Sequence, residues 1–192
     1  MRLGAVILAA GAGTRLGGLA KALLHTGDET YLARIARIAQ LAGTTKIVTV
    51  VGRPHGHQVG DAARALDLGV VVNPLPERGM ASSIALGFAA ISHYDLDAAW
   101  LWPVDHPNVE LRTLEALAAS LGTNEVAQPR YESRGGHPPL IARSLWPRLA
   151  ACGSLPNGAR DVISAASVVR VAVDDRAVIR DIDTPNDLAE IH

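Results

Sequence analysis

A buried strand that runs into a glycine-rich loop limits the fold of this chain more than any other segment. The apolar run from Gly4 to Ala9 is typical of a buried strand. Four glycines follow within residues 11–18, and Arg15 and Lys21 lie in or just after this loop. Glycines let backbone N–H groups approach a ligand together, and the two cations add positive charge at the same place. We therefore predict that the loop holds the phosphates of a nucleoside triphosphate.

The spacing of these residues excludes the two commonest glycine motifs. A P-loop has Ser or Thr after its lysine, whereas Ala22 follows Lys21 here. A dinucleotide fingerprint has two residues before its third glycine, whereas three residues separate Gly13 from Gly17. The acidic residues nearby precede a helix instead of ending a second strand, so a dehydrogenase is disfavoured. A plain glycine-rich connection is the remaining alternative, but such a loop has no need of two cations.

Composition narrows the class of protein. A chain of 192 residues suits one domain with a sizeable core. Hydrophobic residues make up 48% of the chain and aromatic residues 4%, so we expect a core of Ala, Val, Leu and Ile, as in compact α/β proteins. The net charge of −1 gives no basic patch for nucleic acid, and the single cysteine, Cys152, excludes an internal disulfide.

No membrane segment is expected either. A spanning helix needs about 18 or more apolar residues in a row, and no stretch of the sequence reaches that length. The first predicted strand begins almost at the N-terminus, which leaves no room for a signal peptide. We therefore expect a cytoplasmic protein that binds neither a membrane nor nucleic acid.

Strands and helices alternate through the first two thirds of the sequence. Apolar runs stopped by Gly or Pro predict strands, and apolar residues at helical spacing predict helices between them. The strands are expected at 4–9, 46–51, 70–73 and 98–102, and the helices at 30–41, 57–66, 80–92 and 110–121. This order predicts an α/β fold, a single domain (1–192) whose wound, mostly parallel sheet carries helices on both faces. Residues 1–122 would form its nucleotide-binding half.

The alternation breaks after residue 122. Short strands are expected at 125–128 and 140–142 around a Gly135-Gly136 turn, followed by helices at 145–151 and 157–165. Strands at 168–173 and 178–181 would precede a last helix, which Thr184 caps with Pro185 at its first position. We interpret residues 123–192 as an elaboration of the same domain. It would wall the acceptor side of a cleft at the carboxyl ends of the strands, where open α/β sheets bind ligands.

Several motifs together resemble one protein family. The segment L-A-A-G-x-G-x-R-x-G that starts at Leu8, followed by Lys21, resembles the signature of the nucleotidyltransferases. Five later motifs occur in the order found in the molybdenum cofactor cytidylyltransferase-like branch of that superfamily. They are Asn73-Pro, Gly79-Met80-x-Ser82-Ser83-Ile, Val104-Asp105-His106-Pro107, Arg134-Gly-Gly-His-Pro138 and Asp181-Ile-Asp183-Thr-Pro. The resemblance spans nearly the whole chain, and it implies a fold like that of the nucleotide-diphospho-sugar transferases.

The resemblance also implies an activity. Enzymes of this branch transfer CMP from CTP to the phosphate of molybdopterin and release pyrophosphate, so CTP and molybdopterin are the favoured ligands. The Leu8-Ala-Ala-Gly sequence resembles the cytidylyl branch better than the guanylyl branch, which more often carries a second glycine there. A molybdoenzyme or its chaperone is a further candidate partner. Guanylyl transfer, a sugar phosphate or phospholactate acceptor, and a non-catalytic nucleotide-binding role in molybdoenzyme maturation stay open as alternatives.

Charge neutralisation is the main chemical need, because nucleotide and acceptor phosphate are both anionic. Arg15 can hold the β- and γ-phosphates with its planar fork, and Lys21 can reach the α-phosphate. The alternative for Lys21 is a solvated surface lysine. With Asp105, these two are the candidate catalytic residues. The candidate nucleotide-binding residues are Leu8, Ala9, Ala10, Gly11, Ala12, Gly13, Arg15, Lys21, Asn73, Gly79, Met80, Ser82 and Ser83. For the two serines, an ordinary capped helix is an equally good explanation.

Two carboxylates are candidate ligands for Mg²⁺. Asp105 directly follows a predicted strand between two prolines, and the resemblance gives it the metal-binding role. The alternative is that Asp105 caps the helix that begins near Val109. Asp183 is the second candidate, with Asp181 on the same face of its predicted strand. The alternative for this pair is a strand end and a helix N-terminus, where acidic residues are favoured.

The acceptor is expected to meet Gly136, His137 and Pro138. A Gly-Gly turn followed by His-Pro can present backbone to a flat pterin, and His137 can orient an acceptor phosphate. The alternative is a tight hairpin with a surface histidine. The spacing of His55 and His57 allows a metal pair, but the sequence offers no third ligand nearby.

Overall fold

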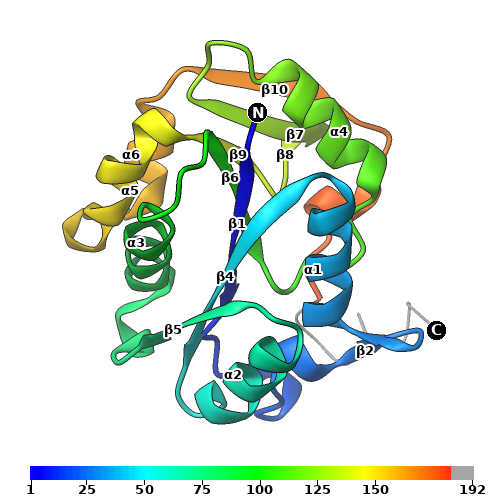
Figure 1. Ribbon diagram of the computed structural model, residues 1–192, viewed down its shortest axis with the longest axis vertical. Coiled ribbons are helices and arrows are strands. Elements are labelled where there is room, and N and C mark those ends of the chain that lie inside the picture. The colour runs from blue at the N-terminus through cyan, green and yellow to red at the C-terminus, as the bar shows by residue number, and fades with distance from the viewer. Residues whose placement is uncertain (183–192) are drawn as a thin grey trace.

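The computed structural model describes residues 1–182, without the side chain of Arg15. Its centre is an eight-stranded sheet with the order β10-β7-β9-β6-β1-β4-β5, in which β8 pairs with β7 (Figure 1). The strands are β1 (Leu3–Ala9), β4 (Thr44–Gly52), β5 (Gly69–Asn73), β6 (Ala98–Pro103), β7 (Val126–Tyr131), β8 (Arg134–Gly135), β9 (Leu140–Ala142) and β10 (Val168–Ala172). A separate hairpin joins β2 (His25–Thr26) to β3 (Glu29–Thr30).

Four of the seven strand pairs in the central sheet are parallel. β1 lies between β4 and β6, and Val6 faces Val48 on one side and Leu101 on the other. β5 extends this parallel set beyond β4. The antiparallel β9 separates β6 from β7, and β10 adds parallel to β7. The prediction of a mostly parallel sheet is therefore confirmed.

Helices cover both faces of the sheet (Figure 1). On one face lie α1 (Tyr31–Leu41), α2 (Gly56–Ala65) and α4 (Leu111–Ser120). On the other lie α3 (Met80–Ile91), α5 (Trp146–Ala150) and α6 (Ala159–Ser164). β1 supplies both cores, because Ala5 and Ile7 point to the first face while Val6 and Leu8 point to the second. The prediction of one domain with helices on both faces is confirmed.

One predicted strand is wrong. Residues Arg176–Ile179 form a 3₁₀ helix, whereas the sequence predicts a strand at 178–181. The reason is Asp175, whose buried carboxylate accepts a hydrogen bond from Ala177 N at 3.0 Å and turns the chain at that point. The remaining 3₁₀ helices are Thr14–Leu16, Lys21–Leu23, Pro76–Arg78, Arg143–Leu145 and Cys152–Ser154. The last predicted helix, with Thr184 and Pro185, lies outside the described residues.

None of the helices in residues 1–182 is long and apolar enough to span a bilayer.

The contact between α3 and β1 gives a prediction about stability. A Cβ added at Gly87 would lie 2.3 Å from a methyl carbon of Val6, so Gly87→Ala overpacks this face. We expect it to lower the free energy of unfolding by about 1 to 3 kcal/mol. Gly60→Ala in α2 is the matched control, because the nearest atom to its new Cβ lies at 3.5 Å. The control should gain about 0.5 to 1 kcal/mol from helix propensity. Urea unfolding measures both, and an equal effect of the two substitutions would contradict the packing account.

Candidate functional site

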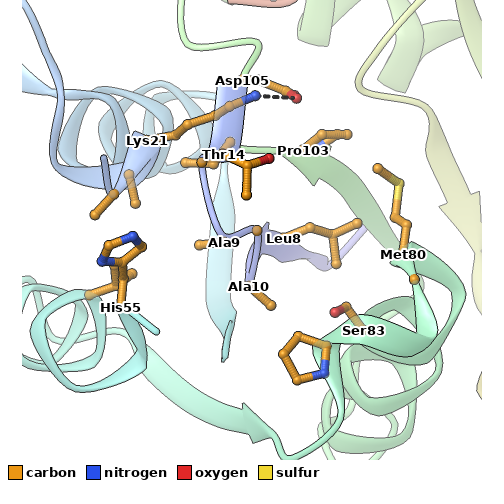
Figure 2. A pocket seen from close by; sticks show the side chains of 18 residues that line it. Leu8, Ala9, Ala10, Thr14, Lys21, His55, Met80, Ser83, Pro103 and Asp105 are labelled. Carbon is orange, nitrogen blue, oxygen red and sulfur yellow. Dashed lines mark ion pairs between the residues drawn. The ribbon is translucent and has the colours of Figure 1, made fainter. Parts of the chain in front are cut away.

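A cavity of about 340 Å³ opens at the carboxyl ends of β1 and β6. The glycine loop and Lys21 line one side of it, and Met80 and Ser83 from the start of α3 line the other (Figure 2). Asp105, which follows β6, completes the wall. This is the edge at which a parallel sheet binds ligands. The fold thus brings together the loop, the lysine and the carboxylate that the sequence had suggested.

Gly13 sets the shape of the loop. Its φ of 62° is a left-handed conformation, and its carbonyl accepts hydrogen bonds from Leu16 N at 2.9 Å and Gly18 N at 3.0 Å. A Cβ at this position would lie 1.9 Å from the carbonyl oxygen of Leu19, so no other residue fits without rebuilding the loop. A Cβ at Gly11, which also lines the cavity, would meet no atom within 4 Å. The loop therefore folds tightly on itself at Gly13, whereas space for a ligand remains beside Gly11.

Lys21 and Asp105 point toward one another at the same edge of the cavity (Figure 2). The Lys21 Nζ lies 3.6 Å from Asp105 Oδ2, and the two side chains are 17% and 22% exposed. Lys21 is therefore not a solvated surface lysine. Asp105 Oδ1 is buried and has no hydrogen-bond partner among the described residues. A buried carboxylate oxygen without a donor is costly, so this atom calls for a ligand that carries positive charge or a proton.

The backbone around Asp105 is fixed from three directions. Val104 N donates to Leu8 O at 3.1 Å, which ties the segment to the end of β1. The indole Nε1 of Trp102 donates to His106 O at 3.0 Å, and Ile182 N donates to Asp105 O at 2.9 Å. Asp105 does not cap a helix, so that alternative is wrong. The first turn of α4 is instead bound by Asp175, which accepts from Glu110 N and Thr113 Oγ1.

The Asp105 carboxylate is a hard oxygen ligand of the kind that a divalent cation prefers. Mg²⁺ prefers hard oxygen ligands and keeps several waters, so one carboxylate oxygen with a roomy cavity beside it is enough from the protein. The second candidate, Asp183, lies outside the described residues. Asp181 does not stand on a strand, because the segment before it is the 3₁₀ helix, and its side chain is exposed. Residues 1–182 contain no group of three acidic, His or Cys side chains that could hold a metal by themselves.

Asn73 and Ser82 do not line the cavity, but their hydrogen bonds support the part of its wall at the start of α3. The Asn73 side chain, 2% exposed, donates to Ser82 Oγ at 2.8 Å and Ser83 Oγ at 2.9 Å, and accepts from Leu75 N at 3.0 Å. Ser82 in turn donates to Gly79 O at 2.7 Å. The polar atoms of Asn73 are thus engaged within the protein. Of the five predicted residues here, Gly79, Met80 and Ser83 line the cavity.

A second pocket of about 810 Å³ adjoins the first, and the two share Leu8, Met80 and Pro103 in their walls. Of the three predicted acceptor residues, His137 lines this pocket. Gly136 is buried against the 176–179 turn, where a Cβ would lie 2.4 Å from Val178 O. Pro138 is buried too. The alternative of a tight hairpin with a surface histidine is half right. β8 pairs antiparallel with β7 around residues 132–133, which is a hairpin, but His137 is not on the surface, because its N donates to Val178 O at 2.7 Å and its Nδ1 is buried.

Two histidines lie next to each other, His106 beside Asp105 and His137 in the wall of the second pocket. The rings of His106 and His137 lie 5.1 Å apart between centroids. His106 is 7% exposed, its Nδ1 lies 3.2 Å from Ala177 O, and its Nε2 lies 3.9 Å from Asp105 Oδ1. The Ala177 carbonyl can only accept, so it engages an N–H at Nδ1, and the 3.9 Å between Nε2 and Asp105 Oδ1 is too long for a hydrogen bond. This explains why Asp105 Oδ1 has no hydrogen-bond partner although a histidine lies so near.

His55 was missed as a site residue by sequence reasoning. It lines the first cavity, and its Nε2 is buried without a partner among the described residues. His57 points elsewhere, with a 91% exposed side chain that pairs with Asp61 at 3.0 Å. The two histidines therefore do not form a metal pair. The spacing of His55 and His57 suggested only a metal pair, because the place of His55 beside the glycine loop depends on the packing of α2 against β4 and the 3₁₀ helix Lys21–Leu23.

The environment of His137 gives a pH prediction. Burial, and secondarily the nearby His106, lowers the pKa of His137 from 6.5 to about 4, while Asp181 opposes the shift. The folded state thus binds fewer protons than the unfolded state between pH 4 and 6.5. The free energy of unfolding should therefore rise with pH through that window and level off above it. Urea unfolding of His137→Gln against the parent chain measures this component, and an unchanged pH slope in the variant would contradict it.

The sequence and fold match known proteins along nearly the whole chain. Residues 5–171 match the model of the MobA-like NTP transferase domain. The nicotine blue oxidoreductase of Paenarthrobacter nicotinovorans is 31% identical over 188 residues, which cover 93% of this chain and 91% of that protein.

Solved structures agree with this match. The crystal structure of Rv0371c from Mycobacterium tuberculosis H37Rv is 28% identical, with a TM-score of 0.82 over 100% of this chain and 97% of that chain. Its complex with manganese is 27% identical, with a TM-score of 0.79 over 100% and 98%. Molybdopterin-guanine dinucleotide biosynthesis protein A from Archaeoglobus fulgidus shares the fold, with 18% identity and a TM-score of 0.68 over 100% and 96%. The chain belongs to the family of the MobA-like NTP transferase domains.

Proposed function

We propose that this nucleotidyltransferase moves CMP from CTP to the phosphate of a small acceptor, with molybdopterin favoured, and releases pyrophosphate. The observation that carries the proposal is one continuous site. The glycine loop, Lys21 and Asp105 bound a cavity of nucleotide size, and this cavity adjoins a second pocket that contains His137. Two adjoining pockets are what a transfer between two bound substrates needs.

The chemistry follows from charge. The acceptor phosphate attacks the α-phosphate, the bond to the β-phosphate breaks, and both reactants are anionic. Lys21, held near the middle of the site, neutralises charge at the α-phosphate as it builds up. Arg15 lies in the same loop, and we propose that it holds the β- and γ-phosphates. The open face at Gly11 lets the triphosphate approach the backbone.

Mg²⁺ is the proposed cofactor. Asp105 would hold it through the oxygen that has no hydrogen-bond donor, and Asp183 is the proposed second ligand. The bound cation supplies Lewis-acid neutralisation of the triphosphate. The manganese complex of the mycobacterial relative supports the use of a divalent metal in this family.

The choice of acceptor and the choice of nucleotide base are both based on sequence motifs. The Arg134-Gly-Gly-His-Pro138 segment supports a molybdopterin acceptor, and Leu8-Ala-Ala-Gly supports CTP over GTP. A molybdoenzyme or its chaperone would then receive the product. A sugar phosphate or phospholactate acceptor, guanylyl transfer and a non-catalytic accessory role are the alternatives that the assay below separates.

The assay is pyrophosphate release with Mg²⁺, each of the four common nucleoside triphosphates, and molybdopterin, a sugar phosphate or phospholactate. We expect release with CTP that requires molybdopterin and stops when EDTA removes the metal. Lys21→Ala should lower the rate by about 10²- to 10³-fold, as loss of one charge-stabilising donor does elsewhere. Lys46→Ala is the matched control, because Lys46 lies over the Tyr94 ring and lines neither pocket. An unchanged rate in Lys21→Ala would rule out the proposed role.

The loop gives a second, independent prediction. Gly13→Ala should abolish CTP binding, because its Cβ collides with the backbone oxygen of Leu19. Gly17→Ala is the control, since Gly17 also has a positive φ of 68° but a Cβ there meets no atom within 4 Å. It should cost about 1 kcal/mol of stability and keep CTP binding. Calorimetric titration with CTP separates the two, and equal affinity in both variants would contradict the loop assignment.

A second candidate function is an oxidoreductase. The observation in its favour is the 31% identity, over most of both chains, to a protein named nicotine blue oxidoreductase. The discriminating assay follows consumption of NADH or NADPH with nicotine blue as acceptor. Consumption of a reduced nicotinamide without pyrophosphate release in the assay above would favour the oxidoreductase.

A further inference from the structure

We propose that His106 is a further protein ligand of the cation at Asp105, and that it binds through its Nε2 atom. This ligand raises the affinity of the site for first-row transition-metal ions such as Mn²⁺ and Co²⁺, while Mg²⁺ can still occupy it through Asp105. The inference rests on the proposed function for the presence of a cation at Asp105. It adds a ligand to that site, because the motifs give His106 no role.

The orientation of the His106 ring is the first argument. Its Nδ1 lies 3.2 Å from Ala177 O, which can only accept and therefore engages an N–H at this atom. In the neutral ring the lone pair is then on Nε2, the atom that lies nearest to Asp105 Oδ1. Metal-bound histidines almost always donate their other ring N–H to a carbonyl or a carboxylate in this way. The contact with Ala177 thus gives His106 the support that a metal ligand has.

The gap between His106 Nε2 and Asp105 Oδ1 is the second argument. At 3.9 Å it is too long for a hydrogen bond. A cation with ligands at about 2.1 Å holds two of them about 3.0 Å apart when they are adjacent and about 4.2 Å apart when they are opposite. The observed separation lies between these limits. One ion can therefore bind both atoms.

The burial of the two atoms is the third argument. Neither has a hydrogen-bond partner among the described residues, Asp105 Oδ1 is buried, and the His106 side chain is 8% exposed. The other carboxylate oxygen, Oδ2, faces Lys21 (Figure 2), which leaves Oδ1 for the cation. A buried carboxylate oxygen beside a buried imidazole lone pair is costly unless a proton or a cation lies between them.

The two donors together indicate the class of cation. Mg²⁺ takes oxygen ligands and keeps several waters, whereas an imidazole adds affinity for transition-metal ions, increasingly from Mn²⁺ to Co²⁺. Residues 1–182 supply no group of three such side chains, so Asp105 and His106 leave positions on the ion for water, for phosphate oxygens and for the proposed Asp183. We therefore expect the protein and the nucleotide to hold the ion jointly.

Spectroscopy of bound Mn²⁺ tests the inference without an activity measurement. The full chain is labelled with ¹⁵N only in histidine and mixed with Mn²⁺ and unlabelled CTP, at about pH 8 because metal binding needs the neutral ring. Electron–nuclear double resonance then detects any ¹⁵N bonded to the metal. We expect a directly bound ¹⁵N whose signal disappears in His106→Gln. His57→Gln is the matched control and should keep the signal, because its side chain is 91% exposed and lines neither pocket.

Calorimetric titration gives a second readout. His106→Gln should weaken Co²⁺ binding by at least about tenfold and change Mg²⁺ binding less, because Mg²⁺ makes little use of nitrogen ligands. Equal losses for the two ions would overturn the inference, as would a ¹⁵N signal that survives in His106→Gln. The parent chain alone can also overturn it, if its bound Mn²⁺ shows no ¹⁵N, whether or not the variant folds.

The failure of the inference is distinguishable from that of the proposed function. Mn²⁺ that binds without a ¹⁵N signal, and no longer binds in Asp105→Asn, would overturn the role of His106 and leave the cation site at Asp105 standing. No binding of Mn²⁺ to the parent chain would count against both.

Discussion

The position of the Asp105 carboxylate is the constraint on which the site depends. One oxygen faces Lys21, and the other is buried with no donor among the described residues. Leaving such an atom unsatisfied costs about 1 to 3 kcal/mol, so the chain must hold it there by other means. Three backbone contacts do so, from Leu8, from the indole of Trp102 to His106, and from Ile182. A cation bound at the proposed site would satisfy this oxygen.

A second buried carboxylate holds the turn that contacts both His106, next to Asp105, and His137. Asp175, 3% exposed, joins the start of α4 to the 176–179 turn by accepting three hydrogen bonds. The same turn offers Ala177 O to His106 and Val178 O to His137. One short segment thus orients the loop that carries Asp105 and the histidine of the acceptor pocket. The proposed nucleotide and acceptor sites therefore share a support.

The features of the fold and of the site that depend on local sequence patterns could be predicted from the sequence. The strands and helices of the first 122 residues, the parallel sheet and the meeting of the loop with Lys21 and Asp105 follow from apolar periodicity and from strand ends that share one edge. The 176–179 turn was mistaken for a strand, because its apolar residues stand in a short run and the effect of Asp175 depends on a distant helix. The place of His55 in the cavity was missed for the same reason, because it is set by tertiary contacts that no sequence spacing records.

The most direct test of the account is a crystal structure of the chain with CTP and Mn²⁺, whose anomalous signal locates the metal. The account predicts the triphosphate along residues 11–21, with Lys21 at the α-phosphate and Mn²⁺ bonded to Asp105. It also predicts that the second pocket stays open beside the α-phosphate for the acceptor. Triphosphate density away from the glycine loop, or a metal that does not touch Asp105, would contradict it.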